Sequence, residues 1–281
     1  MNREVITSTS NQRIKNISSL LKRADKRKRD NVYVVEGVRL VLDAPLDDIQ
    51  NIYVSDKLLN KSSTRDSTKS PDGSDEDCDR IRHFLEECDN AGIDITVVSS
   101  DVIKRITDTV TPQGIVAVIR RHNNCTYQGR DTYLLLEDIQ DPGNMGTLLR
   151  SAEAAGIDMV IMSKGCVDIY NPKTIRSTMG TIYRLPYLRC LDDSMWYKII
   201  DELKDAGVRL YGGCLNDSTY YGDVDYSSRC GIVIGNEGSG ISDATLNMID
   251  KVHIPMKGGI ESLNASVAGS ILMYEINRHK R

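Results

Sequence analysis

The 281-residue sequence lacks the features that mark several large protein classes. No stretch approaches the roughly 18 consecutive apolar residues of a membrane-spanning helix, and the polar N-terminus has no apolar core of a signal peptide. The seven cysteines form no CxxC pair and the four histidines form no HExxH motif, so we expect neither a disulfide framework nor a bound metal. We therefore predict a protein of the reducing cytoplasm with no membrane partner.

The composition is that of an ordinary globular protein, with 40% hydrophobic and 27% charged residues. The length suits one large domain or two ordinary ones. A net charge of −4 argues weakly against nucleic-acid binding, but the charge is unevenly distributed. Residues 13–29 are densely basic and residues 70–79 are acidic. A basic segment in an acidic protein can still bind a polyanion locally.

Apolar periodicity predicts alternating helices and strands in the first half of the chain, which we assign to a domain of residues 1–121. The segment 61–79 is rich in Ser, Asp and Gly without periodicity, which predicts a mobile, acidic surface insert. The polar residues 122–130 form the predicted linker. Helices are expected at 11–25, 37–42, 81–91 and 101–106, and strands at 32–35, 52–54, 95–98 and 115–119.

The second half, residues 131–281, predicts a second α/β domain. Short apolar strands alternate with helices there, which favours a parallel sheet covered on both faces. In the last helix we expect the stripe of Val267, Ile271, Leu272 and Ile276 to lie in the core. The expected strands are 133–136, 159–162, 209–212, 231–234 and 252–254, and the helices are 145–155, 172–177, 194–206 and 265–278.

Three polar, Gly-rich clusters follow strands of this second half. In the first, residues 137–156, Asn144 could cap a helix or serve a function, and Arg150 by itself reads as a surface arginine. In the second, residues 231–242, the glycines follow the order G-x-x-G-x-G. This order fits neither a dinucleotide fingerprint nor a P-loop, and alone could make a tight turn.

The third cluster, residues 254–275, places Ser262, Asn264 and Ser266 at a helix start, where capping accounts for only one of them. Ligands of open α/β sheets bind at the carboxyl ends of the strands. The three clusters therefore predict one ligand site at that edge of the sheet.

These clusters resemble the motifs of SpoU-type (TrmH-like) RNA 2′-O-ribose methyltransferases of the SPOUT superfamily. The resemblance spans residues 132–278 and rests on 144–150, 235–238, 254–256 and 261–268. Residues 168–173, Arg176, Met179 and Gly180 also fit. The first half is similar to the L30e-like substrate-binding domain of that family, although the 61–79 insert departs from it. That second resemblance rests on Thr7, Ser8, Asn11, Ile14, Lys15, 35–37 and 111–114.

The resemblance implies a C-terminal parallel-sheet α/β domain with a deep trefoil knot, preceded by a smaller L30e-like α/β domain. It implies methyl transfer from S-adenosylmethionine to a ribose 2′-hydroxyl of structured RNA, either ribosomal or transfer RNA. It also implies a homodimer whose active site borrows residues from both subunits. The nucleotide that is modified stays open.

Carried over to this sequence, the resemblance also implies site residues. Because a guanidinium stays protonated, we expect Arg150 to bind phosphate, orient the hydroxyl or stabilise a developing alkoxide rather than act as a base. The implied catalytic residues are Arg150, Asn144, Glu237, Ser262 and Asn264; the cofactor-binding residues are Gly235, Ile254, Met256, Leu263 and Asn264; and the RNA-binding residues are Asn11, Lys15, Lys26, Arg27, Lys28 and Arg29.

Two other functions compete with this one. A non-catalytic RNA-binding protein could keep the fold, although the intact set of Arg150, Glu237 and Asn264 argues against it. A nucleotide-dependent oxidoreductase would need a dinucleotide fingerprint, which the sequence lacks.

Overall fold

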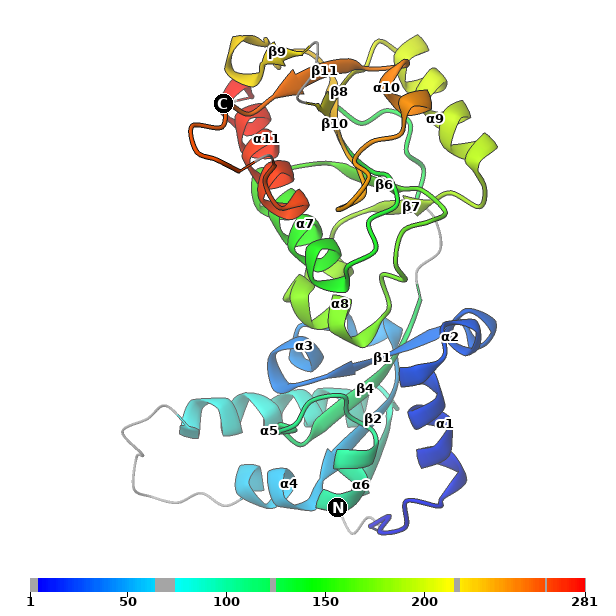
Figure 1. Cartoon of the computed structure of the whole chain (residues 1–281). Coiled ribbons are helices and arrows are strands. Elements are labelled where there is room, and N and C mark those ends of the chain that lie inside the picture. Colours follow the sequence, from blue (N-terminus) through cyan, green and yellow to red (C-terminus); the bar gives the residue numbers. More distant parts are fainter. Residues whose placement is uncertain (1–4, 64–73, 122–124, 215–217, 261, 281) are drawn as a thin grey trace. The chain divides into compact units, whose positions relative to one another are not determined.

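The computed structural model describes residues 5–63, 74–121, 125–214, 218–260 and 262–280, and forms two compact units (Figure 1). The first unit comprises Met1–His122 together with Tyr170–Arg176. The second comprises Asn123–Ile169 and Ser177–Arg281. Residues 170–176, which follow a strand of the second unit in the sequence, thus belong by their contacts to the first unit.

The first unit is built around a four-stranded sheet with the order β1-β4-β2-β3, in which only β2 and β3 run parallel. Helix α1 buries Ile14, Ile17 and Leu20 against this sheet, as its helical spacing predicts. The strands are β1 (Val32–Glu36), β2 (Ile49–Ser55), β3 (Asp94–Val98) and β4 (Ile115–Arg120); the helices are α1 (Gln12–Lys22), α2 (Ala24–Asp30), α3 (Val38–Leu42), α4 (Asp56–Ser63), α5 (Ser74–Asn90) and α6 (Ser100–Arg105), with a 3-10 turn at Leu46–Asp48.

Two expectations for this unit need correction. The helix predicted at 11–25 ends at Lys22, because Arg23 has an extended backbone with φ −120° and ψ 109°, and a separate helix follows. The predicted mobile insert 61–79 is too long at both ends, since 61–63 end α4 and 74–79 begin α5. Residues 64–73 lie outside the described part of the chain.

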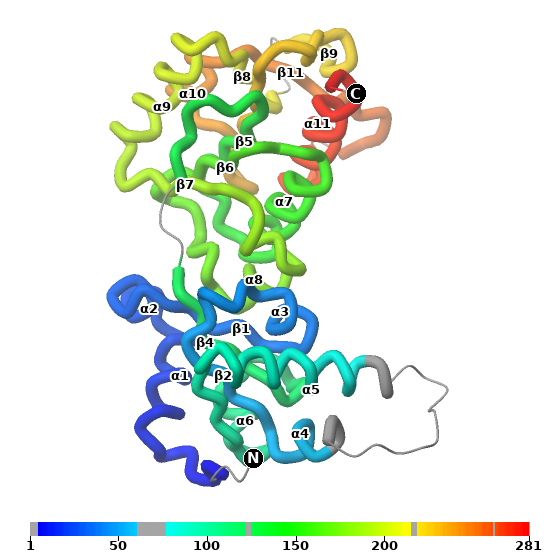
Figure 2. Tube along the Cα trace, turned by 180° about the vertical axis from the view of Figure 1, so that it is seen from behind, coloured from blue at the N-terminus to red at the C-terminus, as the bar shows by residue number. Residues whose placement is uncertain are grey.

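The second unit contains a fully parallel seven-stranded sheet with the order β7-β6-β5-β10-β8-β11-β9, which confirms the predicted parallel α/β architecture. The path of the chain through this unit can be followed in Figure 2. Two short edge strands, β7 and β9, were not predicted. The strands are β5 (Thr132–Leu136), β6 (Met159–Met162), β7 (Tyr187–Arg189), β8 (Arg209–Gly213), β9 (Thr219–Tyr220), β10 (Cys230–Ile234) and β11 (Asp250–His253). The helices are α7 (Pro142–Ala155), α9 (Asp193–Asp205), α10 (Asp243–Leu246) and α11 (Ala265–His279), with 3-10 turns at Thr181–Tyr183 and Tyr221–Asp223. Most of α8 (Pro172–Thr178) belongs by its contacts to the first unit.

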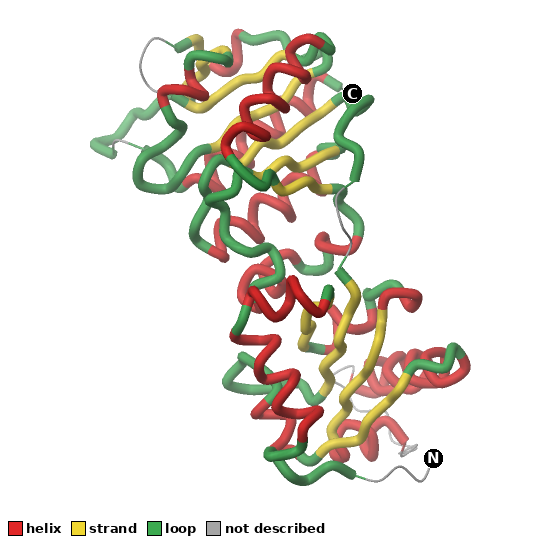
Figure 3. The backbone as a smooth tube through the Cα atoms, turned by 90° about the vertical axis from the view of Figure 1, so that its right-hand side faces the viewer, coloured by secondary structure: helices red, strands yellow, loops and turns green. Residues whose placement is uncertain are grey.

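Helices cover both faces of this sheet (Figure 3). On one face, α9 packs Trp196, Ile199 and Leu203 into a core with the central strands β5 and β10. On the other face, α11 lies against α7 and β10. The sheet is therefore buried on both sides, which accounts for its nearly uninterrupted apolar strands.

Close contact between α7 and α11 depends on a small residue. A Cβ at Gly269 would lie 2.5 Å from Cδ2 of Leu148, so a larger side chain would push the helices apart. The apolar stripe of α11 is only partly core, because Leu272 and Ile276 are buried whereas Val267 is 46% exposed. The expectation that Val267 packs in the core is thus wrong for the isolated chain.

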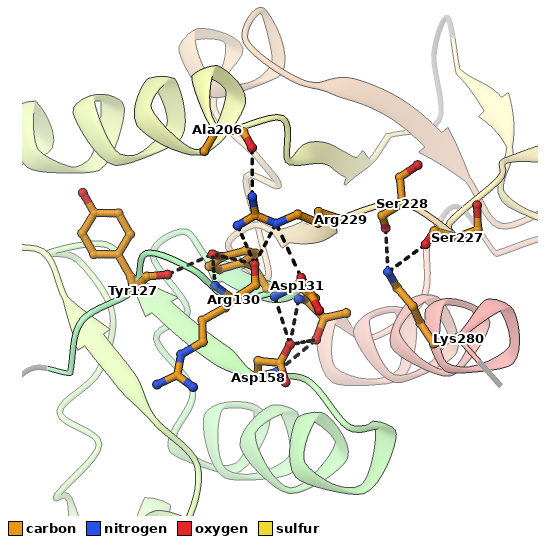
Figure 4. A network of polar contacts seen from close by, with 11 residues as sticks. Tyr127, Arg130, Asp131, Asp158, Ala206, Ser227, Ser228, Arg229 and Lys280 are labelled. Carbon is orange, nitrogen blue, oxygen red and sulfur yellow. Dashed lines mark hydrogen bonds and ion pairs between the residues drawn. The ribbon is translucent and has the colours of Figure 1, made fainter.

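Hydrogen bonds between side chains and main-chain groups connect the amino ends of the central strands (Figure 4). Arg229 donates from Nη2 to the carbonyl of Arg130 (2.7 Å) and from Nη1 to that of Ala206 (3.0 Å). The Oδ2 atom of Asp158 accepts from the backbone N–H of Thr132 at 3.0 Å. These hydrogen bonds fix the amino ends of the strands. The three polar clusters follow the opposite, carboxyl ends.

Candidate functional site

The three polar clusters meet at the carboxyl edge of the sheet. The segment after β5 leads into α7, the Gly-rich loop follows the neighbouring strand β10, and the third cluster begins α11. Because β5 and β10 pair in register through Leu136 and Ile234, the segments that follow them emerge side by side. The predicted convergence of the clusters is therefore a consequence of strand order.

A chain of side-chain hydrogen bonds joins one residue from each cluster. Asn144 Nδ2 donates to Oε1 of Glu237 at 3.0 Å. Asn264 Nδ2 donates to Oδ1 of Asn144 at 3.0 Å. The side-chain oxygen of Asn264, Oδ1, accepts from the backbone N–H of Ser266 at 2.9 Å and so caps α11. Each amide therefore has a fixed orientation.

Glu237 anchors this chain. Its carboxylate also accepts from the backbone N–H groups of Gln140 (3.2 Å) and Asp141 (3.1 Å). Partial burial alone would raise the pKa of Glu237, but the donors from Asn144, Gln140 and Asp141 together hold it below its ordinary value. The carboxylate thus stays ionised at neutral pH and can act only as an acceptor.

The structure assigns the cap of α7 to Asp141 rather than to Asn144. Asp141 Oδ1 accepts from the backbone N–H of Asn144 at 2.8 Å, and Pro142 occupies the first helical position. The capping role considered for Asn144 is thus excluded, and its side chain is left to join Glu237 to Asn264. Of the polar residues predicted at the start of α11, Asn264 is the cap.

The Gly-rich loop after β10 is folded back on itself. Asn236 and Gly240 exchange backbone hydrogen bonds of 3.0 and 2.9 Å, and the Asn236 side chain donates to the carbonyl of Asp138 at 2.8 Å. A Cβ at Gly235 would lie 2.2 Å from the backbone of Gly240 and of Ile241. Gly235 is therefore required by the loop's own packing.

A pocket of about 470 Å³ opens beside this loop. Four of the predicted cofactor-binding residues line it: Gly235, Ile254, Met256 and Leu263. Glu237 and Ser262 line it as well, whereas Asn264 stays outside the lining and reaches it through the hydrogen-bond chain. Much of the remaining wall is apolar, including Leu246, Val252, Ala268 and Leu272.

Arg150 lies on the exposed surface of α7 and away from this pocket lining. It makes no ion pair or hydrogen bond within the described ranges, so its guanidinium is available to a ligand. Six residues at about 100° each place it roughly 120° around the helix from Asn144. Within one polypeptide chain, Arg150 therefore does not contact Glu237 or Asn144.

Sequence reasoning missed Glu137, the residue directly after β5. Its buried carboxylate accepts from Ser242 N–H (3.0 Å) and Oγ (2.7 Å), and from Thr245 Oγ1 (2.7 Å). These bonds fix the start of α10 at the end of the Gly-rich loop. An acidic residue that ends an apolar strand was the available signal, because such a charge needs partners.

The predicted RNA-binding residues fall into two groups. Asn11 caps α1 by accepting from Arg13 N–H at 2.9 Å, and Lys15 is exposed one turn later. The second group is the basic run on α2. There Lys26 donates to Asp30 at 2.6 Å, Arg29 donates to the same carboxylate at 3.2 Å, and Lys28 is exposed.

Arg27 requires a correction. Its side chain is only 3% exposed, and Nη1 donates to the carbonyls of Leu20 (2.6 Å) and Leu21 (3.1 Å). These are carbonyls of the last turn of α1, which lack helical partners. Arg27 thus fastens α2 to α1 and does not present its charge to RNA.

Among the described side chains, no group of three or more His, Cys, Asp or Glu residues is arranged to hold a metal ion. None of the helices in the described ranges is both long and apolar enough to cross a membrane. All seven cysteines carry free thiols.

Comparison with known proteins identifies the family of the chain. Residues 131–274 match the profile of the SpoU rRNA Methylase family, and residues 11–117 match the MRM3-like substrate binding domain. The chain is 33% identical over 272 residues to the 23S rRNA (guanosine(2553)-2′-O)-methyltransferase RlmP of Bacillus subtilis, covering 96% of this chain and 98% of that protein.

Two solved structures agree in fold over nearly the whole chain. The AdoMet-bound rRNA methyltransferase from Sinorhizobium meliloti has 26% identity and a TM-score of 0.81, with 98% of both chains covered. The SpoU methyltransferase AviRb from Streptomyces viridochromogenes in complex with AdoMet has 25% identity and a TM-score of 0.77, covering 96% of this chain and 99% of that one. The chain belongs to the SpoU rRNA methylase family.

Proposed function

We propose that this protein transfers a methyl group from S-adenosylmethionine to a ribose 2′-hydroxyl of 23S ribosomal RNA. The observation that carries the proposal is the hydrogen-bond chain from Glu237 through Asn144 to Asn264, which borders the pocket after β10. The name of the Bacillus subtilis relative supports ribosomal over transfer RNA as the substrate.

The pocket fits S-adenosylmethionine. Its volume of about 470 Å³ and its partly apolar wall suit an adenosine-sized group, and the ionised Glu237 at its lining complements positive charge. When bound, this cofactor supplies a methyl group on an electrophilic sulfonium. Gly235, Ile254, Met256 and Leu263 would hold the cofactor, the last three from the segment before α11.

The polar side chains would orient the groups that react. Asn144 and Asn264 are fixed by their mutual hydrogen bond, so they present preorganised amides without rearrangement. Ser262 is exposed at the pocket and can donate to the methionine end of the cofactor or to the ribose. Arg150, permanently charged and planar, would bind a phosphate and stabilise negative charge on the attacking oxygen.

A homodimer belongs to this proposal, because Arg150 lies apart from the pocket of its own chain. A second copy could bring its Arg150 to that pocket. The surface of α11 supports such an interface, since Val267 and Tyr274, seven residues apart on one helix face, are 46% and 51% exposed. The trefoil knot predicted from the resemblance also stays part of the proposal, supported by the family to which the chain belongs.

Subunit mixing tests the shared site. Arg150→Ala and Glu237→Ala should each be inactive alone. If Arg150 acts on the partner's pocket, mixed dimers regain activity, because one of their two sites contains intact Arg150 and intact Glu237. Mixed dimers that stay inactive would show that both residues act within one chain.

The substrate is tested with isotopically labelled S-adenosylmethionine and purified RNA. We expect incorporation into 23S rRNA lacking its modifications, and none into a transfer RNA pool. Exclusive labelling of transfer RNA would contradict the proposed substrate. Cofactor binding without transfer to any RNA would instead favour a non-catalytic RNA-binding protein.

A further inference from the structure

A second pocket, of about 430 Å³, lies on the first unit, whereas the residues implied in catalysis belong to the second unit. Its lining comes from the start of the described chain, from α1 and from the end of α6. The lining residues are Thr9, Ser10, Lys15, Ser18 and Arg105. Helix α1 and the end of α6 are joined here by Ser18 Oγ, which donates to the carbonyl of Arg105 at 3.2 Å.

The chemistry of this lining suits an anion with several oxygen atoms. Two cations and three hydroxyl groups surround the pocket, and no carboxylate lines it. Lys15 and Arg105 are exposed, and neither forms an ion pair in the part of the chain that the structure describes. Nearby Arg13, by contrast, is paired with Asp94 at 3.0 Å.

The basic run of α2 differs in this respect. Lys26 and Arg29 both contact Asp30, Arg23 contacts Asp25 at 2.7 Å, and Arg27 is buried. A phosphate that bound Lys26 or Arg29 would have to displace the Asp30 carboxylate, which leaves Lys28 as the exposed cation of α2 without an ion pair among the described residues. The pocket on α1 offers fewer positive charges, but they are not already neutralised, and the hydroxyl groups of Thr9 and Ser10 can donate to the same ligand.

We propose that the pocket formed by Thr9, Ser10, Lys15, Ser18 and Arg105 binds a backbone phosphate of the RNA substrate and fixes the first unit on that RNA. This assignment rests on the proposed function for the identity of the RNA. The proposal adds Arg105, which lies 90 positions from Lys15 in the sequence, to the predicted RNA-binding residues. It also places the principal phosphate contact on α1 and α6 instead of α2.

The test compares two double variants that each remove two positive charges. Lys15→Gln with Arg105→Gln removes the pocket cations, and Lys26→Gln with Arg29→Gln removes paired cations of α2 as the matched control. The probe is unmodified 23S rRNA, and affinity is measured over a range of salt concentrations. Each lost phosphate contact should lower the log–log salt slope by about one and weaken binding on the order of tenfold at about 0.1 M salt.

We expect the pocket variant to lose about one unit of slope, the α2 variant to change little, and Lys15→Arg with Arg105→Lys to keep the wild-type slope. Unchanged thermal unfolding and cofactor binding will show that the pocket variant is folded. Equal slopes for the pocket variant and the wild type would overturn the inference, as would a larger loss in the α2 variant.

The proposed function can fail separately. If the wild type binds the RNA but transfers no methyl group, the enzyme proposal fails while the slopes still decide the phosphate site. If the wild type binds no RNA, both are wrong.

Discussion

Substitution of Glu237 perturbs the site directly, because its one carboxylate accepts hydrogen bonds from three donors of the segment after β5. Glu237→Gln keeps the shape but replaces one acceptor oxygen with an NH₂ group. If the remaining oxygen keeps Asn144 and Asp141, the N–H of Gln140 faces a donor and loses its bond. Glu237→Ala removes all three bonds.

The expected loss of unfolding free energy follows from this count. Hydrogen bonds to charged acceptors contribute about 1.5–3 kcal/mol when buried, and solvent at this exposed position reduces that value. We expect about 1 kcal/mol for Glu237→Gln and about 2 kcal/mol for Glu237→Ala. Methyl transfer should fall by roughly 100-fold in Glu237→Gln and be lost in Glu237→Ala, because Asn144 loses its fixed orientation.

Denaturant unfolding and single-turnover methyl transfer measure these two effects, with exposed Glu86→Gln as a control of equal charge change. The pKa of Glu237 is lowered on folding, so its contribution is present above the ordinary value of 4.5 and is lost as the pH falls through the lower folded-state pKa. The stability gap between wild type and Glu237→Gln should therefore close in acid. A gap that is the same at about pH 3 and at pH 7, or full activity in Glu237→Gln, would refute the reasoning.

Three further predictions concern the loop, the α1–α2 junction and Arg150. Gly235→Ala should lower the free energy of unfolding by about 1–3 kcal/mol and weaken cofactor binding, because the new Cβ would lie 2.2 Å from the loop backbone. In the same denaturant titration, Gly238→Ala should change that free energy by less than about 0.5 kcal/mol, because its Cβ would meet only Asn236 Oδ1 at 3.5 Å. Arg27→Met should lower the free energy of unfolding by about 2 kcal/mol, because the Leu20 carbonyl loses its hydrogen-bond donor. Arg29→Met should lower it by less than about 0.5 kcal/mol, and similar losses in the two variants would contradict the capping role of Arg27. Arg150→Ala and Arg150→Lys should both abolish methyl transfer while calorimetry shows cofactor binding unchanged, and turnover in either would contradict the assignment.

The sequence was sufficient for the family, the enzyme class and the parallel architecture, because these rest on motifs and on strand patterning that tertiary contacts do not override. Turnover by this chain and its compartment stay predictions. Local roles were less accessible. Asn144 and Asp141 are both good capping residues three positions apart, and only the backbone geometry after β5 selects Asp141.

Long-range partners explain the remaining differences. Arg27 looks like one of several exposed cations until the extended Arg23 turns α2 back towards the end of α1. Glu137 and Ser242 are 105 positions apart, so no local pattern links them. Likewise, Val267 has the spacing of a core residue but is 46% exposed, which is consistent with the proposed dimer.

The central claim is that the pocket and the Glu237–Asn144–Asn264 chain serve methylation of a ribose oxygen. It is tested most directly by incubating unmodified 23S rRNA with the protein and S-adenosylmethionine carrying a deuterated methyl group, then digesting the RNA to nucleosides for mass spectrometry. We predict that the label appears in one 2′-O-methylated nucleoside, with the added mass on the ribose fragment, and that it disappears with Glu237→Ala. Label on the base fragment, or no label in any nucleoside, would contradict the account.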